Sequence, residues 1–156
     1  MSQLPYVESF RDLIVYKKAR QLSLDVFEAT KCFPREETFS LTDQIRRSSR
    51  SVGAQIAEAW AKRRYEKHFV SKLTDADGEQ QETQHWLEMA ADCGYLTEQQ
   101  TDQLVSKCSE IGRLLGGMIA KAELFCGTPL KTIRESTADY FVDGVIRNQQ
   151  SLTTDN

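Results

Sequence analysis

The stretch SLTDQIRRSSRSVGAQIAEAWAKRR, residues 40–64, predicts one helix with two unlike faces. Positions that recur every three or four residues lie on one side of an α-helix. The positions that share this side are Leu41, Ile45, Ser48, Val52, Ile56 and Ala59. Arg46, Arg47 and Arg50 project elsewhere, and three more basic residues close the last turn. The apolar side requires a core, whereas the basic side faces either water or an anion.

Three further segments repeat this spacing and predict helices over residues 9–33, 66–93 and 98–126. Each segment offers a seam that other helices can cover. The inward positions are Val15, Ala19, Leu22, Val26, Ala29 and Phe33 in the first, Phe69, Leu73, Ala76, Gln80, Thr83, Leu87 and Ala90 in the second, and Leu104, Cys108, Ile111, Leu115, Met118, Ala122 and Phe125 in the third.

Signals for helix ends separate these segments. Pro34 disfavours helical backbone at the residue before it, so the first helix is expected to stop there. Ser40 suits the N-cap of the next helix. Gly94 suits a left-handed C-cap, and Thr97 with Gln100 predicts a capping box for the last helix. The connections between helices are therefore short.

Glycines also occur inside three of the predicted helices. A glycine in a helix interior costs about 1 kcal/mol relative to alanine. A close approach of a neighbouring helix would explain their presence. The positions concerned are Gly53, Gly78, Gly112 and Gly116.

Four long helices with short connections predict an all-α fold, an antiparallel up-down-up-down four-helix bundle with a C-terminal tail. The bundle is expected to span residues 1–127, ending at Gly127 before Pro129. Residues 128–156 form the tail, in which Thr137 to Arg147 predict a short amphipathic helix and the last residues predict disorder.

The charge of the chain is unevenly distributed. The net charge is only −3, yet residues 46–72 contain eight Lys and Arg against two Glu. Residues 75–110 contain nine Asp and Glu against one Lys. Such asymmetry favours oriented contacts, either with another copy of the protein or with an anionic polymer. Two solvated faces that balance each other within one fold would also account for it.

Composition points to the cytoplasm and away from membranes. The four cysteines, Cys32, Cys93, Cys108 and Cys126, are widely spaced and form no C-x-x-C pair. In a chain of 156 residues they predict reduced, buried side chains in a cytosolic protein. No apolar run reaches the length of a membrane span, and the start of the chain lacks a signal-peptide pattern.

Motifs for catalysis are sparse. A di-iron bundle requires two Glu-x-x-His motifs, and this chain has one, Glu82 to His85. The other histidine, His68, lacks the motif, and neither a nucleophile elbow nor a phosphate-binding glycine loop is present. We therefore predict no catalytic residue, no metal ligand and no cofactor. His85 is expected at the surface beside Trp86, and a metal-dependent enzyme using Glu82 and His85 stays as an alternative.

The basic cluster is the one remaining candidate site. Arg46 and Arg50 lie one turn apart with Arg47 beside them, and the planar guanidinium fork suits phosphate. Aromatic side chains nearby, Tyr65 and Phe69, offer stacking surfaces for bases. Further basic residues extend the region: Lys62, Arg63, Arg64, Lys67 and Lys72. The pattern favours binding of RNA or DNA through phosphates. A solvated face and ion pairs between subunits are the alternatives.

Three segments resemble a known bacterial family. They are FRDLIVYKKARQL (residues 10–22), FPREETFSLTDQIRRSSRSVGAQIAEAW (residues 33–60) and ETQHWLEMAADCGYL (residues 82–96). The family consists of four-helix bundles encoded within large-subunit rRNA intervening sequences, and it includes the accessory protein of diversity-generating retroelements. The resemblance runs from about Phe10 to Phe125. One departure is that the usual Asn-Ile-Ala-Glu-Gly motif stands here as QIAEA, residues 55–59.

The resemblance implies a homopentameric ring with basic residues available to nucleic acid. Arg46, Arg47 and Arg50 match the basic motif of the family's second helix. In the retroelement branch the accessory protein binds a reverse transcriptase and its RNA, so a reverse transcriptase is a possible partner. Our expectation is a non-enzymatic, cytoplasmic oligomer that binds RNA or DNA. A protein-binding scaffold or a reverse transcriptase accessory subunit is the alternative.

Overall fold

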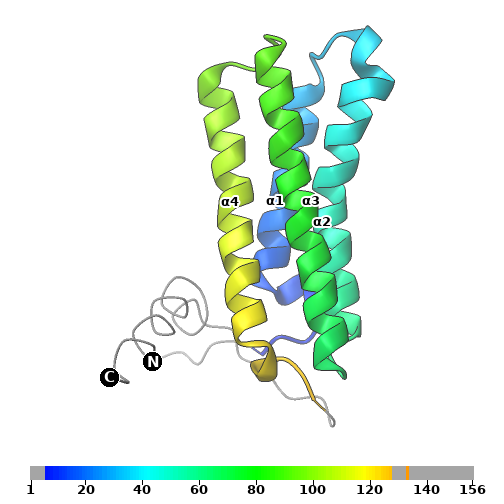
Figure 1. Cartoon of the computed structure of the whole chain (residues 1–156), viewed down its shortest axis with the longest axis vertical. Coiled ribbons are helices and arrows are strands. Elements are labelled where there is room, and N and C mark those ends of the chain that lie inside the picture. Colours follow the sequence, from blue (N-terminus) through cyan, green and yellow to red (C-terminus); the bar gives the residue numbers. More distant parts are fainter. Residues whose placement is uncertain (1–5, 128–132, 134–156) are drawn as a thin grey trace, which may run out of the picture.

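A computed structural model describes residues 6–127 and 133 of the chain (Figure 1). This part of the chain contains four long helices and no β-strand, which confirms the predicted all-α four-helix fold. The helices are α1 (Ile14–Thr30), α2 (Asp43–Ala61), α3 (Glu66–Asp92) and α4 (Glu98–Ala120). In Figure 1 each helix runs opposite to the one before it along the long axis of the molecule. None of the described helices is long and apolar enough to cross a membrane.

The first helix begins later than predicted. A 3-10 turn, η1 (Phe10–Asp12), comes first, and extended backbone at Leu13 separates it from α1. Asp12 Oδ2 accepts hydrogen bonds from the backbone N–H groups of Ser9 and Glu8, at 3.0 Å and 2.9 Å, which stabilises this separate turn. The break directs Leu13, which is fully buried, into the core. The prediction of one continuous helix over residues 9–33 was therefore wrong at its start, and α1 also ends earlier, at Thr30.

The start of α2 also differs from the prediction. A 3-10 turn, η2 (Arg35–Glu37), leads into a π-helical turn, η3 (Thr38–Thr42), which continues directly into α2. Ser40 lies inside that turn, so its assignment as the N-cap was wrong. α2 also ends earlier than predicted, at Ala61 rather than Arg64. At the connection between α3 and α4 the predictions are confirmed. Gly94 has a φ of +79°, and Thr97 forms the predicted capping box, in which its side chain accepts the N–H of Gln100.

The last helix stops at Ala120 and is followed by a 3-10 turn, η4 (Ala122–Leu124), so the predicted extension to residue 126 was wrong. The seam nevertheless continues through the turn, because Ala122 and Phe125 are both buried. The Phe125 ring stacks on Phe69 of α3 with 5.6 Å between the ring centres. Beyond η4 the structure describes residues 125–127, with a φ of 134° at Gly127, and Ile133.

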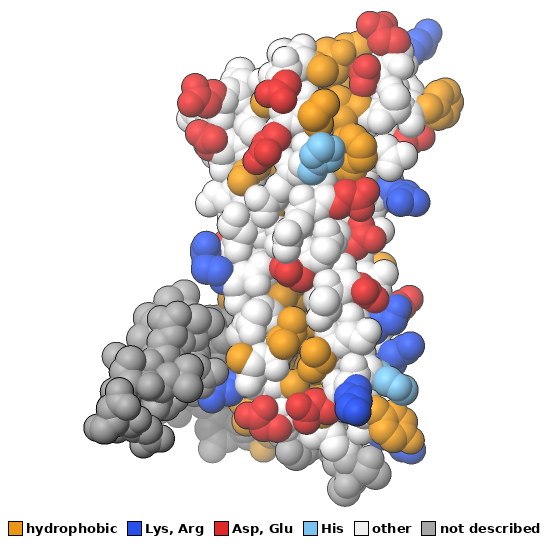
Figure 2. Space-filling view, in the orientation of Figure 1, with side chains coloured by type: hydrophobic (Ala, Val, Ile, Leu, Met, Phe, Trp, Pro, Cys, Tyr) orange, Lys and Arg blue, Asp and Glu red, His pale blue; other side chains and the backbone are white. Residues whose placement is uncertain are grey.

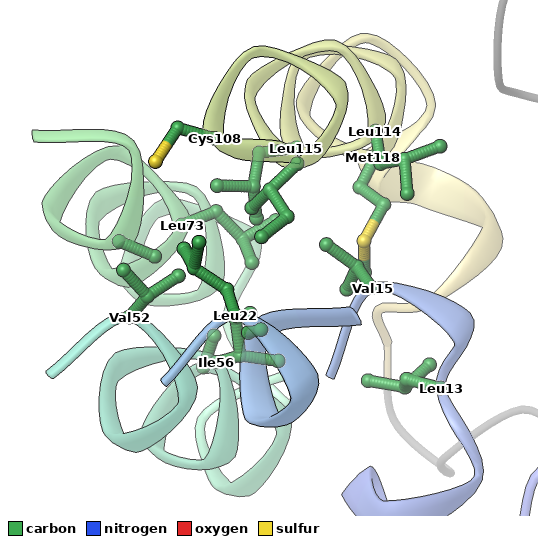
Figure 3. Close-up of a cluster of buried hydrophobic side chains, with 14 of the residues drawn as sticks. Leu13, Val15, Leu22, Val52, Ile56, Leu73, Cys108, Leu114, Leu115 and Met118 are labelled. Atoms are coloured by element: carbon green, nitrogen blue, oxygen red, sulfur yellow. The ribbon is translucent and has the colours of Figure 1, made fainter. Parts of the chain in front are cut away.

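The core lies where the predicted seams meet. Figure 3 shows side chains from all four helices converging, among them Leu22, Val52, Leu73 and Leu115. Every inward position predicted for α2, α3 and α4 is buried. In the first segment Ala29 and Phe33 are only half-buried. Apolar burial of this extent is the main stabilising contribution to the bundle.

Polar residues within the seams are paired. Ser48 of α2 and Thr83 of α3 are joined by a hydrogen bond of 2.9 Å across the helix interface. The Gln80 side chain donates to Asp77 Oδ1 at 2.8 Å and accepts from Gln84 Nε2 at 2.7 Å. These bonds satisfy groups that would otherwise be costly to bury.

The glycines inside the helices divide into two kinds. A Cβ at Gly112 would lie 2.7 Å from Gln80 Nε2, and one at Gly53 would lie 3.5 Å from the Tyr16 ring, so both mark the predicted close approaches. Gly78 and Gly116 have nothing within 4 Å of a Cβ position. The prediction of tight crossings at these two positions was wrong within this fold.

Two of the four cysteines are buried and two are exposed. Cys108 and Cys126 are buried as predicted, and burial raises the pKa of the Cys108 thiol to about 12. Cys32 and Cys93 are exposed, contrary to the prediction, because they follow the last turns of α1 and α3 and lie outside the helical seams.

The predicted tail, residues 128–156, lies outside the described residues apart from Ile133, as does the helix predicted from Thr137 to Arg147. Ile133 is buried, and its carbonyl accepts the N–H of Val7 at 2.8 Å.

Candidate nucleic-acid interface

Two arginines of α2, Arg46 and Arg50, lie over one aromatic ring of α1. The Arg46 guanidinium carbon lies 4.8 Å from the centre of the Phe27 ring, and that of Arg50 lies 5.8 Å from it. Lys31 adds its ammonium nitrogen at 5.0 Å. Three cations therefore share one ring, whose negative face attracts each of them. Arg46 is further fixed because its Nε donates to Thr30 Oγ1 at 2.8 Å.

A depression of about 480 Å³ lies on the surface beside these arginines. Arg46, Arg47 and Arg50 all line it, and Asp43 is the one carboxylate among the lining residues. Ser51 and Ala54 complete it. Within the described part of the chain, none of the three arginines forms an ion pair with Asp or Glu. We call this set of Arg46, Arg47 and Arg50 the arginine cluster.

Carboxylates of α3 border the cluster on the Arg47 side. Burial and the neighbouring Glu82 raise the pKa of Glu79, and the Arg47 guanidinium opposes that shift. Glu79 is half-buried, whereas Arg47 is exposed. Glu79 is therefore one carboxylate of α3 that interacts electrostatically with the cluster.

The remaining basic residues gather at the turn between α2 and α3. Lys62, Arg64 and Lys67 are exposed there. Arg63 is half-buried, because its guanidinium carbon lies 3.5 Å from the centre of the Trp60 ring and its Nε donates to the Trp60 carbonyl at 3.2 Å. Burial lowers the pKa of Arg63. Its backbone carbonyl also accepts the N–H of Gly127, so Arg63 anchors the end of the bundle.

These two groups do not form one compact site. A helix rises 1.5 Å per residue, so Arg50 and Lys62 are separated by about 18 Å along α2. Lys72, which was expected to extend the region, pairs with Glu58 at 2.9 Å and Asp75 at 3.7 Å. Figure 2 shows several Lys and Arg side chains along the α2 edge of the molecule, with acidic side chains among them, and further acidic side chains toward both ends. The structure therefore separates a central cluster from a terminal one.

Of the two aromatic side chains predicted to offer stacking surfaces, Tyr65 is exposed and Phe69 is buried. Tyr65 is 59 % exposed and its ring meets His68 at 5.5 Å, so it is accessible at the terminal cluster. Phe69 is fully buried against Phe125, which makes its predicted role as a stacking surface wrong. The inward periodicity of α3 already placed Phe69 in the seam, and that role excludes exposure.

Sequence reasoning missed the contribution of α1 to this surface. Phe27 and Thr30 position Arg46, although they precede it by 19 and 16 residues. A second depression of about 260 Å³ lies between α1 and α2, with Phe10 and Tyr16 among its lining residues. No spacing rule within a single helix reveals contacts of this kind, because they depend on how two helices pack.

Both polar side chains of the Glu-x-x-His motif of α3 contact Trp86. Glu82 Oε1 accepts a hydrogen bond from Trp86 Nε1 at 3.3 Å. The exposed ring of His85 contacts the Trp86 ring at 4.8 Å between centres, which confirms the predicted position beside Trp86. Among the described residues, no three His, Cys, Asp or Glu side chains are grouped so as to hold a metal ion.

Comparison with known proteins agrees with this architecture. Residues 11–117 match the family model of the 23S rRNA-intervening sequence protein. A crystal structure of a protein of unknown function from the S23 ribosomal protein family of Bacteroides thetaiotaomicron is 31 % identical, with a TM-score of 0.62. The match covers 68 % of this chain and 95 % of that one. No curated protein matches the chain significantly. The chain belongs to the 23S rRNA-intervening sequence protein family.

Proposed function

We propose that this chain is a non-enzymatic, oligomeric protein of the cytoplasm that binds RNA or DNA through the arginine cluster of α2. The observation that carries the proposal is the convergence of Arg46, Arg47 and Arg50 on one depression without an internal carboxylate partner among the described residues. Guanidinium groups without a carboxylate partner at a concave surface suit the oxygens of a phosphate.

Binding by this surface would be largely independent of sequence. Phosphate contacts fix the position of a nucleic acid but carry no base information directly. All of the residues that line the depression belong to α2, beginning with its first residue, Asp43, so no loop is available there to read base edges. Arg46 is held by Thr30 and Phe27, so it loses less side-chain entropy on binding than a free arginine would.

Self-association is the second part of the proposal. Leu24 on α1 is 52 % exposed and Met89 on α3 is 40 % exposed, and Gly116 leaves open space on a face of α4. These features suit the close approach of another helix. We propose a homopentamer, and native mass spectrometry of the full chain at several salt concentrations measures the number of subunits directly.

The experiment for nucleic-acid binding compares two triple variants. Fluorescence anisotropy with a labelled RNA and a duplex DNA is measured for Arg46→Ala/Arg47→Ala/Arg50→Ala and for Lys17→Ala/Arg113→Ala/Lys121→Ala. Both variants remove three positive charges, but the second removes none from the lining of the depression. We expect the first to weaken binding much more than the second. Equal losses would mean that only the overall charge matters, and intact binding by the first variant would refute the proposal.

The same experiment addresses the competing explanations. If the wild type binds neither nucleic acid even at low salt while its oligomer falls apart at high salt, the basic surface serves contacts between subunits. Metal analysis of protein purified without chelators tests the enzyme alternative, and stoichiometric iron or manganese would support a site at Glu82 and His85.

A further inference from the structure

We propose that the nucleic acid bound by the arginine cluster is single-stranded, and that one of its bases sits against Tyr16 in the depression between α1 and α2. This inference rests on the proposed function, since it names the class of ligand for the same surface. It comes from a feature that the phosphate contacts alone do not use. That feature is an apolar, aromatic trough that continues from the arginine cluster.

The trough and the arginine depression are neighbours. Arg50 and Ala54 line both of them. The trough has a volume of about 260 Å³, and small residues on both helices keep it open. These residues are Ala19 on α1 and Gly53 and Ala57 on α2. A group bound at Arg50 could therefore place a flat, apolar neighbour directly in the trough.

The aromatic wall of the trough has a defined geometry. The Phe10 and Tyr16 rings meet edge to face, with 4.9 Å between centres and an angle of 80°. Gly53 has no side chain, and the Tyr16 ring edge lies 3.5 Å from the place where a Cβ would be. Both residues are half-buried, and the Arg11 guanidinium carbon already lies 4.4 Å from the centre of the Phe10 ring, so the proposed stacking surface is Tyr16. A base can stack on such a ring whatever its identity, because every base has a π-face.

The charges of the trough fit a polyanion. Arg20 and Arg50 are its two charged lining residues, and no carboxylate lines it. The trough and the neighbouring arginine depression are together lined by four arginines and one carboxylate, that of Asp43. The positive lining suits either a nucleic acid or the acidic residues 75–110 of a second copy, and the aromatic wall favours the nucleic acid, because its bases can stack on the ring.

The trough also distinguishes single strands from duplexes. In a duplex the base faces are stacked on one another and are unavailable to a protein side chain. A single strand can turn a base away from its neighbours, and stacking on an aromatic side chain then adds to the phosphate contacts. The wild type should therefore bind an oligo(dT) of about 15 nucleotides more tightly than a duplex of equal phosphate number.

The experiment measures the affinity of the full chain for these two probes with four variants. Tyr16→Leu removes the ring but keeps an apolar side chain, and Tyr16→Phe restores the ring. Ala57→Leu fills the trough, and Ala61→Leu is its matched control, because Ala61 is exposed on the same helix and lines neither depression. Circular dichroism and native mass spectrometry verify that each variant keeps its fold and its subunit number.

We expect Tyr16→Leu and Ala57→Leu to weaken oligo(dT) binding by between about 5-fold and about 100-fold, with little change for the duplex. Tyr16→Phe and Ala61→Leu should bind as the wild type does. If both probes bind the wild type equally and the trough variants change nothing, the single-strand inference is overturned while phosphate binding stands. If neither probe binds at low salt, the proposed function itself fails. If Ala57→Leu dissociates the oligomer, the trough is a contact between copies, which also overturns the inference.

Discussion

Replacing Phe27 with Leu should loosen the arginine cluster without damaging the core. The Phe27 ring is half-buried and attracts Arg46, Arg50 and Lys31, at 4.8 Å, 5.8 Å and 5.0 Å. A cation above an aromatic ring contributes about 0.5–1 kcal/mol at an exposed site. The three cations repel one another and share one ring, so their contributions will not simply add. We expect Phe27→Leu to lower the free energy of unfolding by about 1 kcal/mol.

A double-mutant cycle isolates the contact that matters most. Urea unfolding at one protein concentration is measured for the wild type, Phe27→Leu, Arg46→Met and the double variant. We expect a coupling of about 0.5–1 kcal/mol between Phe27 and Arg46. Arg47→Met serves as the matched control, because Arg47 has no contact with the ring among those that the structure shows, and its coupling to Phe27 should be close to zero. Equal coupling of both arginines to Phe27, or none with Arg46, would refute the reasoning.

Three further results follow from the structure. Gly78→Ala should stabilise the fold by about 1 kcal/mol, because nothing lies within 4 Å of its Cβ position. Gly112→Ala should give no gain, because its Cβ would lie 2.7 Å from a buried, hydrogen-bonded amide. Thermal unfolding should therefore show a higher melting temperature for Gly78→Ala and an unchanged or lower one for Gly112→Ala. The Lys72–Glu58 pair lowers the pKa of Glu58 below 4.5 and raises that of Lys72 above 10.5, so its stabilisation should be lost as pH falls through the lowered carboxyl pKa or rises through the raised amine pKa. The stability difference between wild type and Lys72→Met should therefore be level between the ordinary pKa values of the two groups, 4.5 and 10.5, and should shrink beyond them. A difference that grows in acid would contradict this prediction. The Cys108 thiol, with a pKa of about 12, should resist iodoacetamide at pH 8 while the two exposed thiols react, and mass spectrometry showing its rapid labelling in the folded protein would rule this out.

The seams of the bundle could be predicted because they depend on local spacing. In α3 every inward position from Phe69 to Ala90 is buried, and the caps at Gly94 and Thr97 form as their residue types require. The starts of the helices were harder to predict from the sequence. The turn at η1 depends on Asp12, which accepts hydrogen bonds from two backbone N–H groups. Ser40, which was predicted to be an N-cap, lies inside the π-helical turn before α2.

The candidate site could be predicted only where it lies on one helix. The one-turn spacing of Arg46 and Arg50 was readable, and the structure places both at the same depression. Contacts between helices were not readable. Phe27 and Thr30 reach Arg46 across the α1–α2 interface, and Lys72 pairs with Glu58 across the α2–α3 interface. Such contacts depend on the rotation of each helix about its axis, which the hydrophobic pattern fixes only approximately.

The most direct test of phosphate binding by the arginine cluster is the salt dependence of affinity. The slope of log Kobs against log salt reports the number of phosphates neutralised, at about 0.9 per contact for duplex DNA and about 0.7 for a single strand. For the wild type and the Arg46→Ala/Arg47→Ala/Arg50→Ala variant, measured with the same nucleic acid, we predict that the slope falls by about 2–3 in the variant. An unchanged slope would contradict the account, because the phosphates would then be held elsewhere on the protein.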